Sequence, residues 1–195
     1  MDYVFESERL GFRRWQTSDR EPFAAMNANP DVMEFFPENL SRAESDALVD
    51  RIEAHFEKTG YGLWAVERKE DGAFIGFIGL LDVNFDIGVK GATEIGWRLD
   101  PKFWKQGYAT EGAKACLAYA FEELGKTAIY SFTAAINIPS ISVMKRIGME
   151  KTGEFEHPPQ GREPAEDFAG LVGQPDRRLR RDKGIGAALV HQRIV

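Results

Sequence analysis

The fold is decided by residues 93–149, which begin Thr93-Glu94-Ile95-Gly96-Trp97-Arg98-Leu99-Asp100. Apolar and polar residues alternate along this run with a period of two, and this period predicts a strand. The pair Asp100-Pro101 is expected to end the strand, because proline has no backbone N–H to donate to a neighbouring strand. A turn over residues 104–111 then leads into apolar positions with helical spacing, which end at Gly125.

The turn over residues 104–111 has the composition of an anion site. Gly107 allows a ligand to approach the backbone closely, and Ala109 keeps the entry to the helix small. The first N–H groups of a helix have no intrahelical partner, and the helix dipole is positive there. The turn therefore predicts a diphosphate site. A purely structural turn is the alternative, since strand–turn–helix junctions with one glycine are common.

A second strand and a short helix are predicted after this unit. Residues 128–134 have the composition of a strand, and Asn137-Ile138-Pro139-Ser140 then starts a helix with proline in its first turn. Apolar residues follow at helical spacing, and Gly148 ends the helix.

Residues 93–149 resemble the GNAT family of acetyl-CoA-dependent N-acetyltransferases. The family's pyrophosphate loop has the form Arg/Gln-x-x-Gly-x-Gly/Ala, and Gly107-x-Ala109 matches its second half, whereas Trp104 stands at its first position. A later family pattern, Asn-x-x-Ser/Ala, maps onto Asn137 and Ser140. The combination is similar to the RimJ/RimL-like branch, which includes the ribosomal-protein N-terminal acetyltransferases.

The resemblance covers roughly Phe5 to Glu156. It implies an α/β (α+β type) domain with a central mixed, mostly antiparallel sheet and helices on both faces. We therefore assign residues 1–156 to a GNAT-like acetyltransferase domain and residues 157–195 to an atypical C-terminal tail. In the resembled branch two closing strands follow the last motif helix, but the final strand is not evident in this tail. A replaced or frame-shifted C-terminus and a flexible or swapped tail are the two interpretations.

Composition limits the function class. The chain has 195 residues, 43% hydrophobic and 29% charged, as expected for one soluble globular domain. No apolar run could span a bilayer, the N-terminus lacks signal-peptide features, and the single Cys116 fits a reducing compartment. The net charge of −6 disfavours a nucleic-acid partner and favours a cationic substrate. We expect a cytoplasmic protein with no membrane or nucleic-acid partner, and we leave a homodimer open.

The resemblance implies acetyl-CoA as cosubstrate and no metal. The backbone of Trp97, Arg98 and Leu99 is expected to pair with the pantetheine arm as a pseudo-strand. The diphosphate is expected on the turn formed by Gln106, Gly107, Tyr108, Ala109 and Thr110. By resemblance, Asn137 bonds a pantetheine amide, and a simple helix cap is the alternative for this residue.

Glu94 is our candidate for the base that takes the proton from the attacking amine. It lies on the strand face opposite Ile95 and Trp97, and a carboxylate in a partly apolar cleft has a raised pKa. A solvated carboxylate or an ion pair with Arg98 is the alternative. His55 and His157 are weaker candidates for the base.

A hydroxyl is needed near the leaving thiolate. Many GNAT enzymes use a Tyr in the last motif helix, but the aligned position is Met144, which cannot donate a proton. Ser140 is the remaining hydroxyl at a motif position, with a structural serine at a helix start as the alternative. Tyr130 is a fallback candidate.

Together with these residues, the resemblance to the GNAT family implies transfer of an acetyl group from acetyl-CoA to a primary amine, on a protein N-terminus or a small molecule, by direct attack in a ternary complex. By resemblance to the family, the region from residue 17 to residue 60 is expected to shape the acceptor side, and Phe35-Phe36 could line its pocket or pack in the core. A non-catalytic acyl-CoA-binding regulator is the alternative function. A nucleotide-binding P-loop is disfavoured because its Gly-x-x-x-x-Gly-Lys-Ser/Thr pattern is missing.

Overall fold

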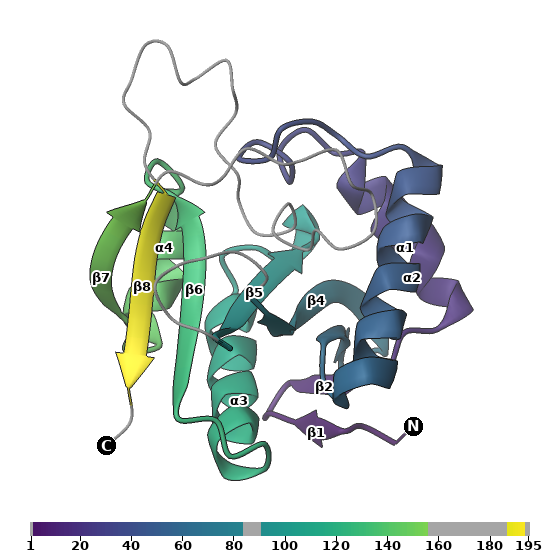
Figure 1. Cartoon of the computed structure of the whole chain (residues 1–195). Coiled ribbons are helices and arrows are strands. Elements are labelled where there is room, and N and C mark those ends of the chain that lie inside the picture. The colour runs from purple at the N-terminus through teal and green to yellow at the C-terminus, as the bar shows by residue number, and fades with distance from the viewer. Residues whose placement is uncertain (1, 84–90, 156–186, 194–195) are drawn as a thin grey trace.

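The computed structural model describes residues 2–83, 91–155 and 187–193 of the chain (Figure 1). The strands in these residues are β1 (Phe5–Glu6), β2 (Leu10–Arg13), β3 (Leu63–Arg68), β4 (Ala73–Asp82), β5 (Thr93–Leu99), β6 (Ala128–Ala134), β7 (Glu150–Phe155) and β8 (Ala187–Arg193). The α-helices are α1 (Arg20–Asn27), α2 (Arg42–Thr59), α3 (Tyr108–Glu122) and α4 (Ile138–Arg146), and two 3-10 helices are η1 (Thr17–Asp19) and η2 (Pro101–Phe103).

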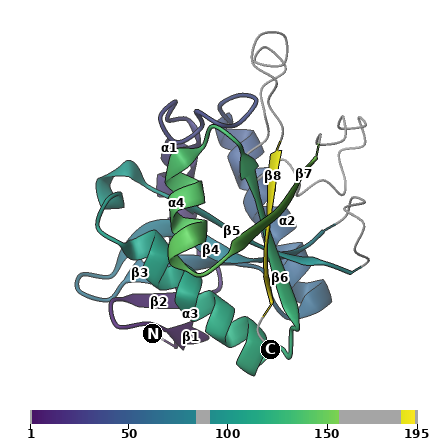
Figure 2. The same cartoon turned by 90° about the vertical axis from the view of Figure 1, so that its left-hand side faces the viewer.

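The strands form one sheet in the order β1-β2-β3-β4-β5-β6-β8-β7. Each neighbouring pair is antiparallel except β5 and β6, which are parallel. The predicted mixed and mostly antiparallel sheet is therefore confirmed. Figure 2 shows α3 and α4 on the side of the sheet that faces the viewer and α2 behind the sheet, so helices cover both faces as predicted.

The final strand, which the sequence left uncertain, is β8. It lies between β6 and β7 and pairs antiparallel with both. The strand has the sequence Ala187-Ala188-Leu189-Val190-His191-Gln192-Arg193, in which apolar and polar residues do not alternate clearly. Pairing with its two neighbours, rather than β-propensity, therefore accounts for its strand geometry. Residues 156–186, which include His157 and most of the predicted tail, lie outside the described residues. The domain boundary at residue 156 stays a prediction.

Residues within the chain's own local sequence fix both ends of helix α2. Ser41 and Glu44 form a reciprocal capping box, and Gly60 ends the helix in a left-handed conformation. The buried residues of this helix include Leu48, Ile52 and Phe56, which are at most 3% exposed and belong to the main hydrophobic core.

Strand β5 is fixed in the sheet by β4. The two strands are in register over all seven residues of β5, from Thr93 opposite Asp82 to Leu99 opposite Gly76. Gly76 has a φ of +130°, and a Cβ there would lie 2.1 Å from the carbonyl oxygen of Arg98. Only glycine permits this approach, so β4 holds the functional strand β5 at a spacing that a larger residue would disrupt.

Candidate active site

A cavity of about 380 Å³ lies where β5 and β6 separate. In the described residues, these parallel strands are in register at one pair, Glu94 of β5 opposite Tyr130 of β6, which lies near the start of β5. Beyond it, the C-terminal part of β5 and the middle of β6 both line the cavity. The remaining walls come from residues 31–36, the turn over residues 103–110, and α4. Five segments that are remote in sequence therefore enclose one space.

The predicted diphosphate turn forms one wall of this cavity. Gly107 caps α3 with a φ of +86°, and it lines the cavity together with Tyr108, Ala109 and Thr110. Its conformation directs the start of a 15-residue helix toward the cavity, which is the arrangement that binds anions. Gln106 does not line the cavity, and its side-chain amide donates to the carbonyl of Lys102 at 2.8 Å instead.

Trp104 has a definite place in this wall. Its indole N–H donates to the carbonyl of Leu99 at 2.7 Å, and the residue is 39% exposed and lines the cavity. This bond ties the turn to the end of β5. The departure from the family's Arg/Gln is therefore accommodated by a contact that holds the turn in place.

Arg9, from the β1–β2 connection, supports the same turn from outside the cavity. Its guanidinium donates to the carboxylate of Glu111 at 2.6 Å and to the carbonyl of Gln106 at 3.2 Å, and it lies 4.4 Å from the centre of the Tyr108 ring. Ser7 donates to the same carboxylate at 2.7 Å. These contacts join residues about a hundred positions apart in the chain, so no local sequence pattern indicated them.

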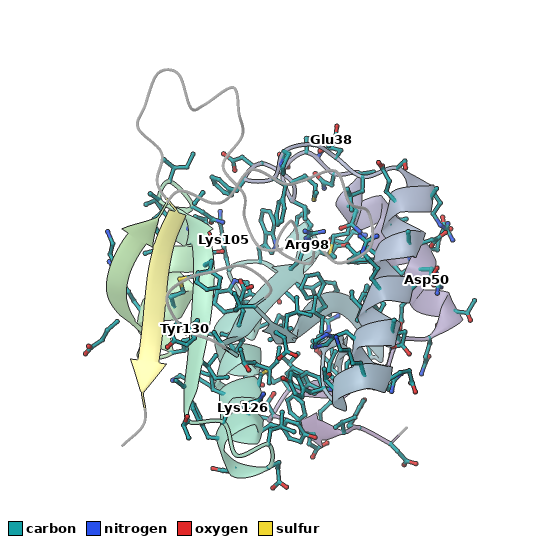
Figure 3. The ribbon with its side chains drawn as sticks, in the orientation of Figure 1. Glu38, Asp50, Arg98, Lys105, Lys126 and Tyr130 are labelled. Atoms are coloured by element: carbon teal, nitrogen blue, oxygen red, sulfur yellow. The ribbon has the colours of Figure 1, made fainter. Side chains whose placement is uncertain are left out.

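The three β5 residues predicted to bind the pantetheine arm, Trp97, Arg98 and Leu99, all line the cavity. The Arg98 side chain is 4% exposed, donates to Oδ1 of Asn27 at 2.7 Å, and lies over the ring of Phe36 at 4.2 Å. Burial lowers the pKa of Arg98 to about 9, which leaves the guanidinium charged at neutral pH. In Figure 3, Arg98 lies on the α1–α2 side of β5, whereas Lys105 lies nearer β6.

Helix α4 brings Asn137 and Ser140 to the cavity. Asn137 is the N-cap of α4, and its side-chain oxygen accepts the backbone N–H of Ser140 at 3.1 Å. The helix-cap interpretation of Asn137 is therefore confirmed, and both residues also line the cavity. Met144, at the position where relatives carry Tyr, is 1% exposed and lines the cavity as well.

Glu94 lies behind the cavity rather than on its wall. The residue is 4% exposed, its carboxylate accepts the backbone N–H of Phe132, and its Oε1 has no hydrogen-bond partner within the described chain. Burial raises the pKa of Glu94 well above its usual value, in the predicted direction, and excludes the solvated carboxylate considered as an alternative. Tyr130 and His55 are also buried and do not line the cavity.

The sequence did not indicate two further features of the cavity. One is its charge: the carboxylates of Asp31 and Glu34 lie on the wall that carries Phe35 and Phe36, and the cations Lys105 and Arg146 lie among the lining residues of the turn and α4. The other is the contribution of β6, through Ser131, Phe132 and Thr133. These residues line the cavity because β6 separates from β5 beyond the Glu94–Tyr130 pair, and this separation is a feature of the tertiary structure.

The model of the protein family described as acetyltransferase (GNAT) domain matches residues 9–150 of the chain. The chain belongs to the GNAT acetyltransferase family. It is therefore an acetyl-CoA-dependent N-acetyltransferase, and the predicted membership of the GNAT family is confirmed.

Three known proteins illustrate this relationship. The chain is 30% identical over 152 residues to the uncharacterized N-acetyltransferase YnaD of Bacillus subtilis, with 77% of this chain and 84% of YnaD covered. It is 32% identical over 158 residues to the FsC-acetyl coenzyme A-N(2)-transacetylase of Aspergillus fumigatus, with 75% of this chain and 66% of the relative covered. The structure of RimL, a ribosomal α-N-protein acetyltransferase in complex with coenzyme A, is 14% identical, covers 99% of this chain and 98% of its own, and has a TM-score of 0.70. At this level of identity, the similarity to RimL shows a shared fold and no more.

The residues of the cavity fit an acyl-CoA. The left-handed Gly107 leaves room at the helix start, where an added Cβ would meet only the Arg9 guanidinium, at 3.4 Å. Lys105 and Arg146 lie on the cavity wall and would supply positive charge for its phosphates, and the separated strands would offer backbone groups to its extended arm. Among the described helices, none combines the length and the apolar character that crossing a membrane requires.

Proposed function

We propose that this enzyme transfers the acetyl group to a primary amine that is protonated in solution, on a protein N-terminus or a small molecule, by direct attack in a ternary complex. One observation carries the proposal. A single cavity reaches from the helix start at Gly107 to the acidic and aromatic wall at residues 31–36. Donor and acceptor could therefore occupy it together, which is the condition for direct transfer.

The position of the single cysteine supports direct attack over an acyl-enzyme route. Cys116 is fully buried in α3 and does not line the cavity. Burial raises the pKa of its thiol, which disfavours the nucleophilic thiolate. Within the described residues, the cavity wall thus contains no thiol that could carry the acetyl group.

The acidic wall supports a cationic acceptor. Asp31 and Glu34 are both exposed and line the cavity, so their carboxylates would attract an ammonium group. Phe35 and Phe36 add aromatic surface beside them. Conversion of Asp31 and Glu34 to amides should raise KM for the amine and leave KM for acetyl-CoA nearly unchanged.

When bound, acetyl-CoA supplies the acetyl group as a thioester. In this proposal, the ionised form of Glu94 accepts the amine proton at Oε1, and the proton must pass through an intervening group because Glu94 does not line the cavity. Ser140, half-buried on the cavity wall, offers its hydroxyl to the leaving sulfur. The Glu94→Gln variant should lose about 10²- to 10⁴-fold in turnover if the carboxyl is the base.

Steady-state kinetics with two varied substrates tests the proposal. Thiol release is measured with an N-terminal peptide, a diamine and a simple alkylamine, and the best acceptor is then varied against acetyl-CoA. We expect intersecting double-reciprocal lines. Parallel lines would indicate an acyl-enzyme, and acetyl-CoA binding without thiol release for any amine would instead support the non-catalytic alternative.

A further inference from the structure

The loop that carries the acidic and aromatic wall is closed at its base by a buried residue, Asn27. This loop covers residues 28–40 between α1 and α2, and most of residues 31–36 line the cavity. Asn27 is the last residue of α1 and is 0% exposed. Its backbone carbonyl accepts the N–H of Leu40 at 3.0 Å. The start and the end of the loop therefore meet at Asn27.

The side chain of Asn27 connects this base to strand β5. Its Oδ1 accepts a hydrogen bond from the Arg98 guanidinium at 2.7 Å, and its Nδ2 donates to Oγ of Ser45, in α2, at 2.8 Å. A guanidinium has only donors, so the amide oxygen must face Arg98 and the amide nitrogen is left for Ser45. The three residues are at most 4% exposed. A buried charge is costly unless it is hydrogen-bonded, so the bond to Asn27 stabilises Arg98 in this position.

Arg98 also contacts the wall itself. Its guanidinium lies 4.2 Å from the centre of the Phe36 ring, and both residues line the cavity. One guanidinium therefore joins the base of the loop, through Asn27, to its cavity-lining part, through Phe36. Strand β5, from which Arg98 extends, is in register with β4 over its whole length. The loop is thus attached to a firmly held strand.

We infer that Asn27 is a positioning residue for acetyl transfer: it holds Arg98, and this link fixes the acceptor wall at residues 31–36 relative to strand β5. The inference rests on the proposed function, because it requires the amine at this wall and the thioester beside β5. Asn27 does not line the cavity, so it acts through Arg98 and the loop rather than by touching a substrate. A displacement of about 1 Å between reacting groups can slow a reaction about a hundredfold.

Asn27→Leu tests the link without changing a residue of the cavity wall. Leucine has a similar size but cannot accept a hydrogen bond from Arg98. The value of kcat/KM for the amine should fall about ten- to hundredfold. The affinity for acetyl-CoA should stay nearly unchanged, because β4 still holds the backbone of β5. Asn27→Ser, which shortens the side chain and keeps a polar group for its buried neighbours, should act in the same direction if the leucine variant does not fold.

Asn27→Asp is the conservative variant that should rescue turnover. Its carboxylate accepts from the Arg98 guanidinium, and the Ser45 hydroxyl can turn to donate to it. The link between the loop and β5 is therefore kept, and kcat/KM for the amine should stay close to that of the wild type.

Ser45→Ala is the matched control for stability. It removes the other partner of the Asn27 amide and leaves the Arg98–Asn27 bond in place. A buried donor then lacks its acceptor, so the melting temperature should fall. The value of kcat/KM for the amine should stay close to that of the wild type, which separates a loss of stability from a loss of positioning.

Three measurements on the full chain decide the matter: thiol release with the amine varied at saturating acetyl-CoA, calorimetric titration with acetyl-CoA, and thermal unfolding. Unchanged kcat/KM in the folded Asn27→Leu or Asn27→Ser variant would overturn the inference. So would an equal loss in Ser45→Ala or in Asn27→Asp, or a parallel loss of acetyl-CoA affinity. A wild-type protein that releases no thiol with any amine would overturn the proposed function as well, whereas wild-type turnover that the Asn27 variants retain would overturn this inference alone.

Discussion

The two edges of strand β5 have different functions. Along one edge, β4 pairs with every residue from Thr93 to Leu99. Along the other, β6 is in register at Glu94 and both strands then border the cavity. Backbone groups on the first edge stabilise the sheet, whereas those on the second edge become available to a ligand. The comparison shows how one strand can be held firmly and still present a binding edge.

The largest effect is expected on the paired edge. Gly76→Ala would place a Cβ 2.1 Å from the Arg98 carbonyl at a φ of +130°, and we expect a loss of about 3 kcal/mol or more in the free energy of unfolding. Urea denaturation measures this loss. Gly60→Ala is the control. Gly60 has a φ of +79°, and no atom lies within 4 Å of an added Cβ. This variant therefore measures the backbone strain without the steric clash. Equal losses in the two variants would contradict the steric argument.

On the open edge, binding should suffer more than stability. Gly107→Val adds a branched side chain at a φ of +86° beside the predicted diphosphate site, and we expect acetyl-CoA affinity to fall at least tenfold. The thermal shift produced by acetyl-CoA measures this change. Gly125→Val is the control, since Gly125 has a φ of +62° and lies outside the cavity wall. Affinity equal to that of the wild type would refute the diphosphate assignment.

Glu94, at the point where the two edges begin to differ, should make stability depend on pH. Burial raises its pKa in the folded state, so above the ordinary pKa of a glutamate the folded protein holds a proton that the unfolded chain has lost. Stability contributed by the neutral form is therefore complete at low pH and is lost as the pH rises through the folded pKa, with a slope of at most about 1.4 kcal/mol per pH unit.

The Glu94→Gln variant should lack this slope. Unfolding measured from pH 5 to pH 8 should show the variant gaining on the wild type as the pH rises. Asp71→Asn is the control. The Arg68 guanidinium lowers the pKa of Asp71 to about 2, so Asp71 stays ionised from pH 5 to pH 8 and its replacement should not alter the pH dependence of stability in that range. Parallel pH profiles of Glu94→Gln and the wild type would show that Glu94 is not buried as described.

The smallest effect concerns the α4 wall, beyond both edges. Ser140→Ala should lower turnover about tenfold and leave acetyl-CoA affinity nearly intact, because the hydroxyl is assigned to the leaving sulfur and the backbone N–H still meets Asn137. Ser140→Thr, which keeps a hydroxyl, should restore most of the turnover. Unchanged turnover in Ser140→Ala would remove this residue from the mechanism.

The features that the sequence by itself determined are local ones. The alternation of β5, the left-handed Gly107 before α3, the capping box of α2 and the Asn137 cap of α4 each depend on residues within a few positions of one another. Backbone sterics and the period of apolar residues act at that range, which is why these elements could be predicted, whereas the cofactor roles of the residues that line the cavity stay predictions.

Only the tertiary structure decided the rest. It placed β8 between β6 and β7, brought Arg9 to Glu111, buried Glu94 behind the cavity, and joined Arg98 to Asn27. Each of these features depends on where remote segments meet or separate. The free energy of such contacts comes from burial and hydrogen bonding between distant parts of the chain, and no period or motif within a single segment encodes it.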